Sequence, residues 1–256
     1  MDNSPSSQKV RVNVTVRTPA TNPIVVVEVP TGPCDPIDLL PAFRSIDDVL
    51  VAEARQASVA AGRPVTCRKG CDWCCYQLVP VTGIEARWLG ALVESLPNAH
   101  RAIVQTRFAA AASQLAEGGL RDQVTAAWSL ERAQSCRLAA RYFRLWIACP
   151  FLEDHQCSIY SERPLACREY VVTSPTQACE TLGQVDRIPV PGRLSPRLGR
   201  DEANRVTWVP LVLVPEWVVA HTEEDQPGDG RTGPELLAEA LGTRVRHEQQ
   251  STVGLE

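Results

Sequence analysis

Alternation between apolar and polar residues is clearest near the start of the chain. From Lys9 to Arg17 every second residue is a valine, and the residues between them are polar or charged. A period of two predicts a β-strand with one buried face. A second β-branched run at 23–29 follows the short segment TPATNP, so the two runs predict an antiparallel hairpin.

From Asp35 onward the apolar spacing becomes helical. Asp35 and Pro36 predict an N-cap and a first helical residue, and Pro41 is expected to interrupt the helix before it continues from Ser45 to a stop at Gly62. Further along, Thr82 and Glu85 form a capping box that predicts the start of a helix reaching about Leu96.

Two longer helices are predicted at 97–119 and 122–148. The second is amphipathic, and its large apolar residues are expected to face the core rather than a cofactor: Trp128, Leu138, Phe143 and Trp146.

The last quarter of the chain gives weaker signals. Residues 183–200 are rich in Pro, Gly and Arg and predict a loop, whereas WVPLVLVPEWVVAH at 208–221 fits strand and helix equally. Residues 233–242 predict a short helix, and the tail after Gly242 is expected to fray. We therefore predict a mainly α fold with a small β-hairpin portion (α+β). Its expected parts are an N-terminal hairpin extension (1–33), a cysteine-cluster helical domain (34–182) and a C-terminal loop and helical extension (183–256).

Composition narrows the function classes. The 256 residues are 44% hydrophobic and 22% charged with a net charge of −4, which is ordinary for a soluble protein. There is no long basic run to bind nucleic acid and no apolar stretch long enough to span a membrane. The N-terminal MDNSPSSQKV lacks the apolar core of a secretory signal, so a cytoplasmic location is expected.

Ten cysteines are the unusual feature of this composition. Eight of them fall in two groups, at 67–75 and 149–179, whereas Cys34 and Cys136 stand apart and are expected to be buried structural thiols. A reducing compartment favours metal binding or catalysis over disulfides, although disulfide or thiol-redox chemistry stays an alternative.

The first segment, CRKGCDWCC, places four thiols in nine positions. A helical turn would put all four on one face with Trp73 pointing away, but Gly70 makes a tight turn leading into a helix equally acceptable. Closely spaced thiolates repel unless a cation holds them, so metal binding is predicted. Of the vicinal Cys74 and Cys75, one is expected to join Cys67 and Cys71, while the other turns to a second site or is spare.

The second segment contains CPFLEDHQCSIYSERPLACREY and the following SPTQACE. EDHQ predicts a hairpin turn whose strands carry Cys149 and Cys157, and Arg163-Pro164 predicts a short helix bearing Cys167. Arg168 is either a counter-charge to a metal–thiolate site or a solvated side chain. His155 at the hairpin tip is expected to be a surface residue rather than a ligand.

Together these motifs resemble the YkgJ-type cysteine-cluster family, also described as zinc- or iron-chelating (CxxxCxxCC) proteins. The similarity covers about residues 67–180: a C-x3-C-x2-CC block, then C-P-x-L, C-x-I-Y, R-P and C-R-x-Y in that order. The resemblance implies up to eight metal-binding cysteines: Cys67, Cys71, Cys74, Cys75, Cys149, Cys157, Cys167 and Cys179. One branch of the family is similar to flagellin lysine N-methylases, which implies an iron–sulfur cluster used with S-adenosylmethionine (SAM). This chain has no G-x-G-type SAM loop.

Three metal-centred interpretations follow. A [4Fe–4S] cluster is favoured because it takes four thiolates and can draw them from both groups. Two structural zinc sites of four thiolates each are the alternative. A radical-SAM enzyme is less consistent, because long helices follow the motif where βα units would be needed.

Whether the protein is an enzyme is open at this stage. The sequence contains no nucleophile elbow, phosphate loop or H-E-x-x-H motif, so any redox or SAM-linked methyl-transfer activity would centre on the metal. Basic residues flank the cysteines and are either solvated or able to attract an anionic substrate: Arg63, Arg68, Lys69, Arg163 and Arg168. The sequence predicts no partner and no oligomeric state.

Overall fold

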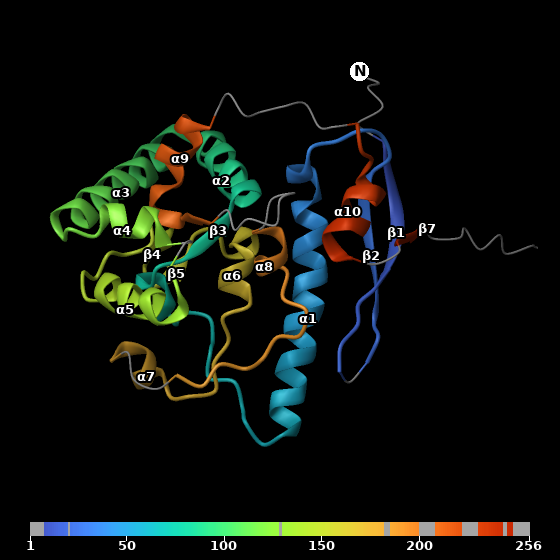
Figure 1. Cartoon of the computed structure of the whole chain (residues 1–256), viewed down its shortest axis with the longest axis horizontal. Coiled ribbons are helices and arrows are strands. Elements are labelled where there is room, and N and C mark those ends of the chain that lie inside the picture. Colours follow the sequence, from blue (N-terminus) through green and yellow to red (C-terminus); the bar gives the residue numbers. More distant parts are fainter. Residues whose placement is uncertain are drawn as a thin grey trace, which may run out of the picture.

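The computed structural model describes residues 8–19, 21–127, 130–181, 185–199, 208–221, 230–242 and 245–247. The described chain is mainly α-helical, with small antiparallel sheets, as predicted (Figure 1). The largest sheet has three strands in the order β2 (Ile24–Pro30), β1 (Lys9–Thr15) and β7 (Val245–His247). Two-stranded pairs form between β3 (Pro80–Thr82) and β6 (Trp208–Pro210) and between β4 (Leu152–Glu153) and β5 (Gln156–Cys157).

The predicted N-terminal hairpin is confirmed. Strand β1 (Lys9–Thr15) pairs antiparallel with β2 (Ile24–Pro30), with Val12 opposite Val27. The expectation that the tail frays after Gly242 is wrong for three residues, because β7 (Val245–His247) pairs with the other edge of β1. This pairing satisfies backbone groups that an edge strand would otherwise leave open. Residues 248–256 lie outside the described part.

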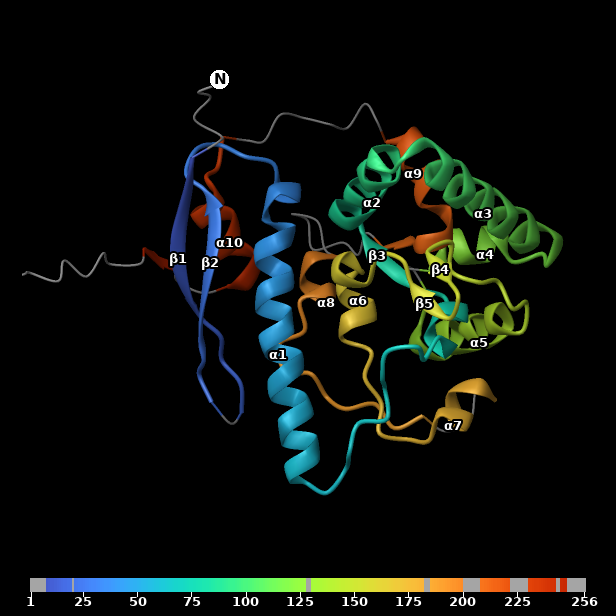
Figure 2. The ribbon, with the colours of Figure 1, turned by 180° about the vertical axis from the view of Figure 1, so that it is seen from behind.

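One face of this sheet is covered by helices α1 (Leu40–Ala60) and α10 (Gly233–Leu241), which Figures 1 and 2 both place against the strands. The alternating valines point toward them and are buried: Val12, Val14, Val16, Val25, Val27 and Val29. Helix α10 approaches very closely, since a Cβ at Gly233 would lie 2.5 Å from the carbonyl oxygen of Pro30. Glycine is therefore the residue that lets this helix contact the hairpin.

The entry to α1 follows the prediction in part. A 3-10 turn, η2 (Pro36–Leu39), begins at Asp35, whose carboxylate accepts a hydrogen bond from the Ile37 N–H at 2.8 Å. The expectation that Pro41 interrupts the helix is wrong. Pro41 lies in the first turn of α1, where a helical N–H has no acceptor and its absence costs nothing.

The other half of the molecule is built from α2 (Gly83–Ser95), α3 (Asn98–Glu117) and α9 (Val214–Ala220). The predicted capping box at the start of α2 is confirmed by reciprocal hydrogen bonds between Thr82 and Glu85. The ambiguous segment at 208–221 is both strand and helix: β6 (Trp208–Pro210) pairs with β3 (Pro80–Thr82), and η6 (Leu211–Leu213) leads into α9.

The single helix predicted at 122–148 is wrong. The chain forms α4 (Arg121–Thr125) and α5 (Arg132–Phe143), and α5 begins with a capping box between Glu131 and Gln134. Leu138 and Phe143 are buried as predicted, but Trp146 is 48% exposed and its φ is +53°. Trp128 lies outside the described residues.

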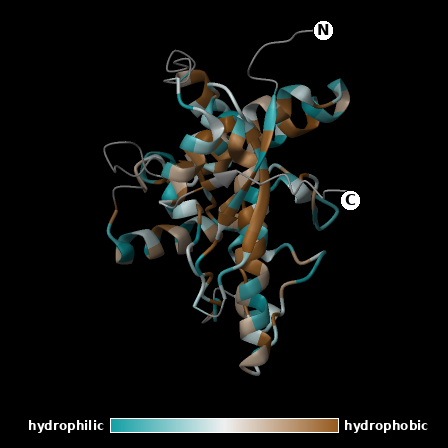
Figure 3. Ribbon diagram, turned by 90° about the vertical axis from the view of Figure 1, so that its right-hand side faces the viewer, coloured by the Kyte–Doolittle hydropathy of each residue, from teal (hydrophilic) through white to brown (hydrophobic). Residues whose placement is uncertain are grey.

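The buried residues form three clusters. The first packs the hairpin, α1 and α10 together with Leu165, Val171 and Ile188, so it draws on all three parts expected from the sequence. The second lies between α2, α3 and β6, and the third between α3, α4 and α5. Figure 3 shows hydrophobic residues along the strands in the centre of the view. Among the described helices, none combines the length and hydropathy needed to cross a membrane.

Candidate metal centre

All eight cysteines singled out in the sequence line one pocket of about 250 Å³. Four belong to the loop and turn at 67–75, and four come from the segment 149–179: Cys67, Cys71, Cys74, Cys75, Cys149, Cys157, Cys167 and Cys179. All ten cysteines of the chain carry free thiols. Thiols from two segments that are far apart in sequence therefore share one space.

The first segment is a tight turn followed by one turn of 3-10 helix, η3 (Trp73–Tyr76), rather than a regular helix. The N–H of Cys71 donates to the carbonyl of Arg68 at 3.1 Å, and that of Cys75 donates to the carbonyl of Asp72 at 2.7 Å. Gly70, inside the turn that the first of these bonds closes, has φ +84°, a left-handed conformation that strains residues with a Cβ. The glycine thus sets the path that folds Cys67 and Cys71 back toward Cys74.

The second segment begins with the predicted hairpin, β4 (Leu152–Glu153) and β5 (Gln156–Cys157). Its turn residues have positive φ, +45° at Asp154 and +61° at His155. Cys157 lies on β5 as predicted. The expectation that a strand carries Cys149 is wrong, because Cys149 precedes β4 by three residues.

Two short helices present the remaining cysteines. Helix α6 (Leu165–Arg168) starts after Pro164, as predicted, and carries Cys167. Helix α7 (Thr176–Glu180) carries Cys179 and lies against η3. Part of the region 183–200, expected to be a loop, forms the four-residue helix α8 (Ser195–Leu198).

Backbone hydrogen bonds hold the two segments together. The N–H of Cys149 donates to the carbonyl of Cys75 at 2.8 Å, and that of Thr66 donates to the carbonyl of Val172 at 3.0 Å. The Val172 N–H in turn donates to the Cys67 sulfur at 3.4 Å. The positions of Cys67 and Cys149 are thus set by the opposite segment.

The pocket thiols fall into two groups that meet at the vicinal pair. Cys67 and Cys71, together with Cys74, contribute after burial to the raised pKa of Cys179, and Cys67 packs against the first core. In the other group, Cys149 and Cys157 act on Cys167, and both pack against the second core. We call these the first group (Cys67, Cys71, Cys179) and the second group (Cys149, Cys157, Cys167).

The vicinal cysteines differ in their surroundings. A hydrogen bond from the Cys75 thiol lowers the pKa of Cys74 to about 7, with a contribution from the Arg163 guanidinium. The pKa of Cys75 is raised, first by that same hydrogen bond and by burial, then by the charges of Cys74, Cys149 and Cys167. Cys75 therefore neighbours the second group, whereas Cys74 interacts with both.

Burial raises the pKa of most of the other thiols. It raises that of Cys149 to about 12 and that of Cys167 well above its ordinary value. The pKa values of Cys67, Cys157 and Cys179 are raised for the same first cause. Without a cation the pocket thus favours neutral thiols, and a bound cation would offset this by stabilising thiolates.

His155 and Arg168, two charged or polar residues of the second segment, differ in their exposure to solvent. His155 is a surface residue as predicted, with a side chain 80% exposed, and its Nδ1 lies 2.8 Å from the Asp72 carboxylate. Arg168 is buried, so the solvated interpretation is wrong. Its guanidinium donates to Asp48 at 2.5 Å and to the carbonyl groups of Ser161 and Arg163, and the residue also lines the cysteine pocket.

The two isolated cysteines differ as well. Cys34 is buried against the first core, as expected of a structural thiol. Cys136 is exposed on α5, so its predicted burial is wrong.

Sequence reasoning missed an aromatic cluster next to the pocket. Trp146 lies 5.9 Å from Trp73 and 4.9 Å from Tyr76 between ring centroids, so η3 is held against the end of α5. The one local signal of this cluster was Trp73, the aromatic residue directly before Cys74. Its contact with Trp146 could not be predicted, because it depends on how two distant segments pack.

Within the described residues, no three His, Cys, Asp or Glu side chains are gathered closely enough to hold a metal ion directly. The donor set is nevertheless rich in thiols, the ligands preferred by iron–sulfur clusters and zinc. Comparison of the chain with protein-family models, with curated proteins and with solved structures finds no match.

Proposed function

We propose that this protein is a cytoplasmic member of the YkgJ-type cysteine-cluster family and binds an iron–sulfur cluster, [4Fe–4S], in the cysteine pocket. One observation carries the proposal: the eight cysteines that define the sequence pattern all line a single pocket, although they come from two segments. Core packing alone does not require eight thiols in one cavity of this size.

The cluster would take four of these eight cysteines as ligands. Cys149, Cys157 and Cys167 with Cys75 are one candidate set of four ligands, and Cys67, Cys71 and Cys179 with Cys74 are another. When bound, a cluster supplies electron transfer or, at an iron with an open position, a binding site for SAM. The family resemblance supports SAM-linked methyl transfer or redox activity as the reaction class.

The chain's own residues would prepare the pocket for such chemistry. Arg55, Arg68 and Lys69 line it and add positive charge that favours anionic molecules. Phe151, Ile159 and Leu211 line its apolar side and limit access of water.

Anaerobic purification followed by iron, sulfide and zinc analysis tests the proposal. We expect brown protein with absorbance at about 400 nm, and with four iron and four sulfide per chain. Colourless protein with stoichiometric zinc would instead establish the alternative, a structural zinc protein. The number of cysteines in the pocket supports that alternative, since eight thiols would supply two sets of four, the number of ligands that structural zinc takes.

A further inference from the structure

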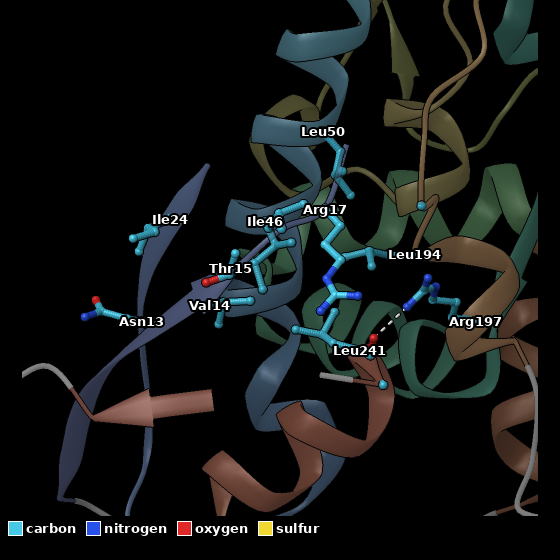
Figure 4. Close-up of a pocket in the computed structure, with 13 residues that line it drawn as sticks. Asn13, Val14, Thr15, Arg17, Ile24, Ile46, Leu50, Leu194, Arg197 and Leu241 are labelled. Atoms are coloured by element: carbon cyan, nitrogen blue, oxygen red, sulfur yellow. Dashed lines mark hydrogen bonds between the residues drawn. The ribbon is translucent and has the colours of Figure 1, made fainter. Parts of the chain in front are cut away.

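A second pocket, of about 830 Å³, lies where β1, α1, the segment 192–197 and the end of α10 meet (Figure 4). Among the described residues it shares no lining residue with the cysteine pocket. Its volume is within the range of about 300–1,000 Å³ usual for small-molecule sites. We call it the arginine pocket, after the two arginines that line it, Arg17 and Arg197. A metal bound to the cysteines would not contact it.

Most of the apolar wall of the arginine pocket belongs to the first of the three clusters of buried residues. Five of its apolar side chains come from β1 and the residues just after it, from α1 and from the segment before α8, and each of these is at most 8% exposed: Val14, Val16, Ile46, Leu50 and Leu194. Ile24 on β2 also lines the pocket and is 65% exposed. Leu241 at the end of α10 continues this surface. An apolar group placed here would leave water and contact side chains that are already fixed by packing.

The charged groups that line the pocket are both arginines. In the described part of the lining, Arg17 and Arg197 are accompanied by no acidic side chain. Figure 4 shows both guanidinium groups pointing into the pocket, Arg17 from the segment just after β1 and Arg197 from α8.

These two arginines are bound differently. Arg197 Nη1 donates to the carbonyl of Leu241 at 2.7 Å, a common role for arginine at a helix C-terminus that leaves its other N–H donors available. Arg17 makes no hydrogen bond or ion pair with any described residue. Two like charges that share a pocket without an acid favour an anion between them.

From this combination we infer that the arginine pocket binds a carboxylate carried on an unbranched apolar chain, as in a medium-chain fatty acid. The carboxylate accepts hydrogen bonds from Arg17 and Arg197, because guanidinium donors match its planar geometry. The chain lies along Val14, Leu50 and Leu194.

Calorimetric titration of the full-length protein tests the assignment with three ten-carbon probes, each used below its micelle concentration or solubility limit. Decanoate binds, decanol binds at least about tenfold more weakly, and decylamine does not bind measurably. From octanoate to decanoate, affinity rises by up to about fourfold for each added methylene. Equal binding of decanoate and decanol, or no binding of decanoate, would overturn the inference.

Arg17→Gln provides the residue-specific test. Because Arg17 has no partner among the described residues, the melting temperature stays unchanged while decanoate affinity falls at least about tenfold. Arg11→Gln is the matched control, since Arg11 lies on β1, six residues before Arg17, but does not line the pocket, and it keeps wild-type affinity. Wild-type affinity in Arg17→Gln contradicts the assignment.

Discussion

The backbone N–H of Cys149 donates a hydrogen bond of 2.8 Å to the carbonyl oxygen of Cys75. This one bond connects the two cysteine segments at the point where the vicinal pair meets the second thiol group. Because it uses backbone atoms, it leaves both thiols available as ligands. The arrangement leads to specific expectations for individual cysteines.

Replacing Cys167 with Ser should reduce metal content by at least half and lower thermal stability. Cys167 adjoins Cys149 and Cys157, and metal-binding free energy contributes directly to folding at such sites. Metal analysis and thermal unfolding of the same preparation measure both effects. The exposed Cys136 provides the control, since Cys136→Ser should keep wild-type metal content. Full loading of Cys167→Ser would argue against this residue as a ligand.

Asp47 should make the protein less stable as the pH rises. Its side chain is fully buried, and neither carboxyl oxygen has a hydrogen-bond partner in the described structure. Burial, and then the charge of Glu169, raise its pKa to about 8, whereas nearby Arg168 opposes the shift and Asp48 adds to it. Between about pH 4 and pH 8 the unfolded chain has lost this proton and the folded chain keeps it, so stability falls with rising pH.

Urea unfolding at several pH values checks this expectation. Asp47→Asn should gain stability over wild type by at most about 1.4 kcal/mol per pH unit between pH 4 and pH 8. The exposed Asp122, changed to Asn, should leave the wild-type pH dependence intact. Parallel curves for wild type and Asp47→Asn would contradict the assigned shift.

Gly233→Ala should destabilise the protein by about 3 kcal/mol, because the new Cβ would meet the Pro30 carbonyl at 2.5 Å and the Val29 Cβ at 2.9 Å. Gly242 ends the same helix with φ +60° and open space around it. Its change to Ala should cost only about 1 kcal/mol of backbone strain. Chemical unfolding of both variants ranks them, and a smaller loss for Gly233→Ala would refute the close contact.

Glu85 should matter more than an ordinary capping residue. Its carboxylate accepts hydrogen bonds from the N–H of Thr82 at 2.9 Å and of Leu165 at 2.7 Å, so it joins α2 to the start of α6. Glu85→Ala leaves two buried donors unpaired and should cost about 3 kcal/mol, with a smaller loss for Glu85→Gln.

The equivalent residue of the capping box on α10 is the comparison. Glu235 is exposed, and Glu235→Ala should cost about 1 kcal/mol. Equal losses for the two alanine variants in urea unfolding would show that the bond to Leu165 adds nothing.

Local signals predicted much of the fold. The alternating valines predicted the hairpin, and the box of Thr82 and Glu85 predicted the start of α2, because both depend on residues only a few positions apart. The third strand could not be predicted. Its three residues acquire a strand conformation only by pairing with β1, more than two hundred residues away.

The candidate site divides in the same way. The spacing of Cys67, Cys71, Cys74 and Cys75 predicted that these thiols gather, and the structure places them in one pocket. The contact between Cys75 and Cys149, and the burial of Arg168 against Asp48, depend on how distant segments pack. No local pattern in the sequence contains that information.

The separation of the two cysteine segments also has a consequence during synthesis on the ribosome. At about 5–20 residues per second, the 73 residues between Cys75 and Cys149 take about 4 to 15 s to translate. Throughout that interval the nascent chain carries four thiols whose pocket partners do not yet exist. The pocket is completed only after Leu211, which lines its apolar side, has left the exit tunnel, when the chain is nearly finished.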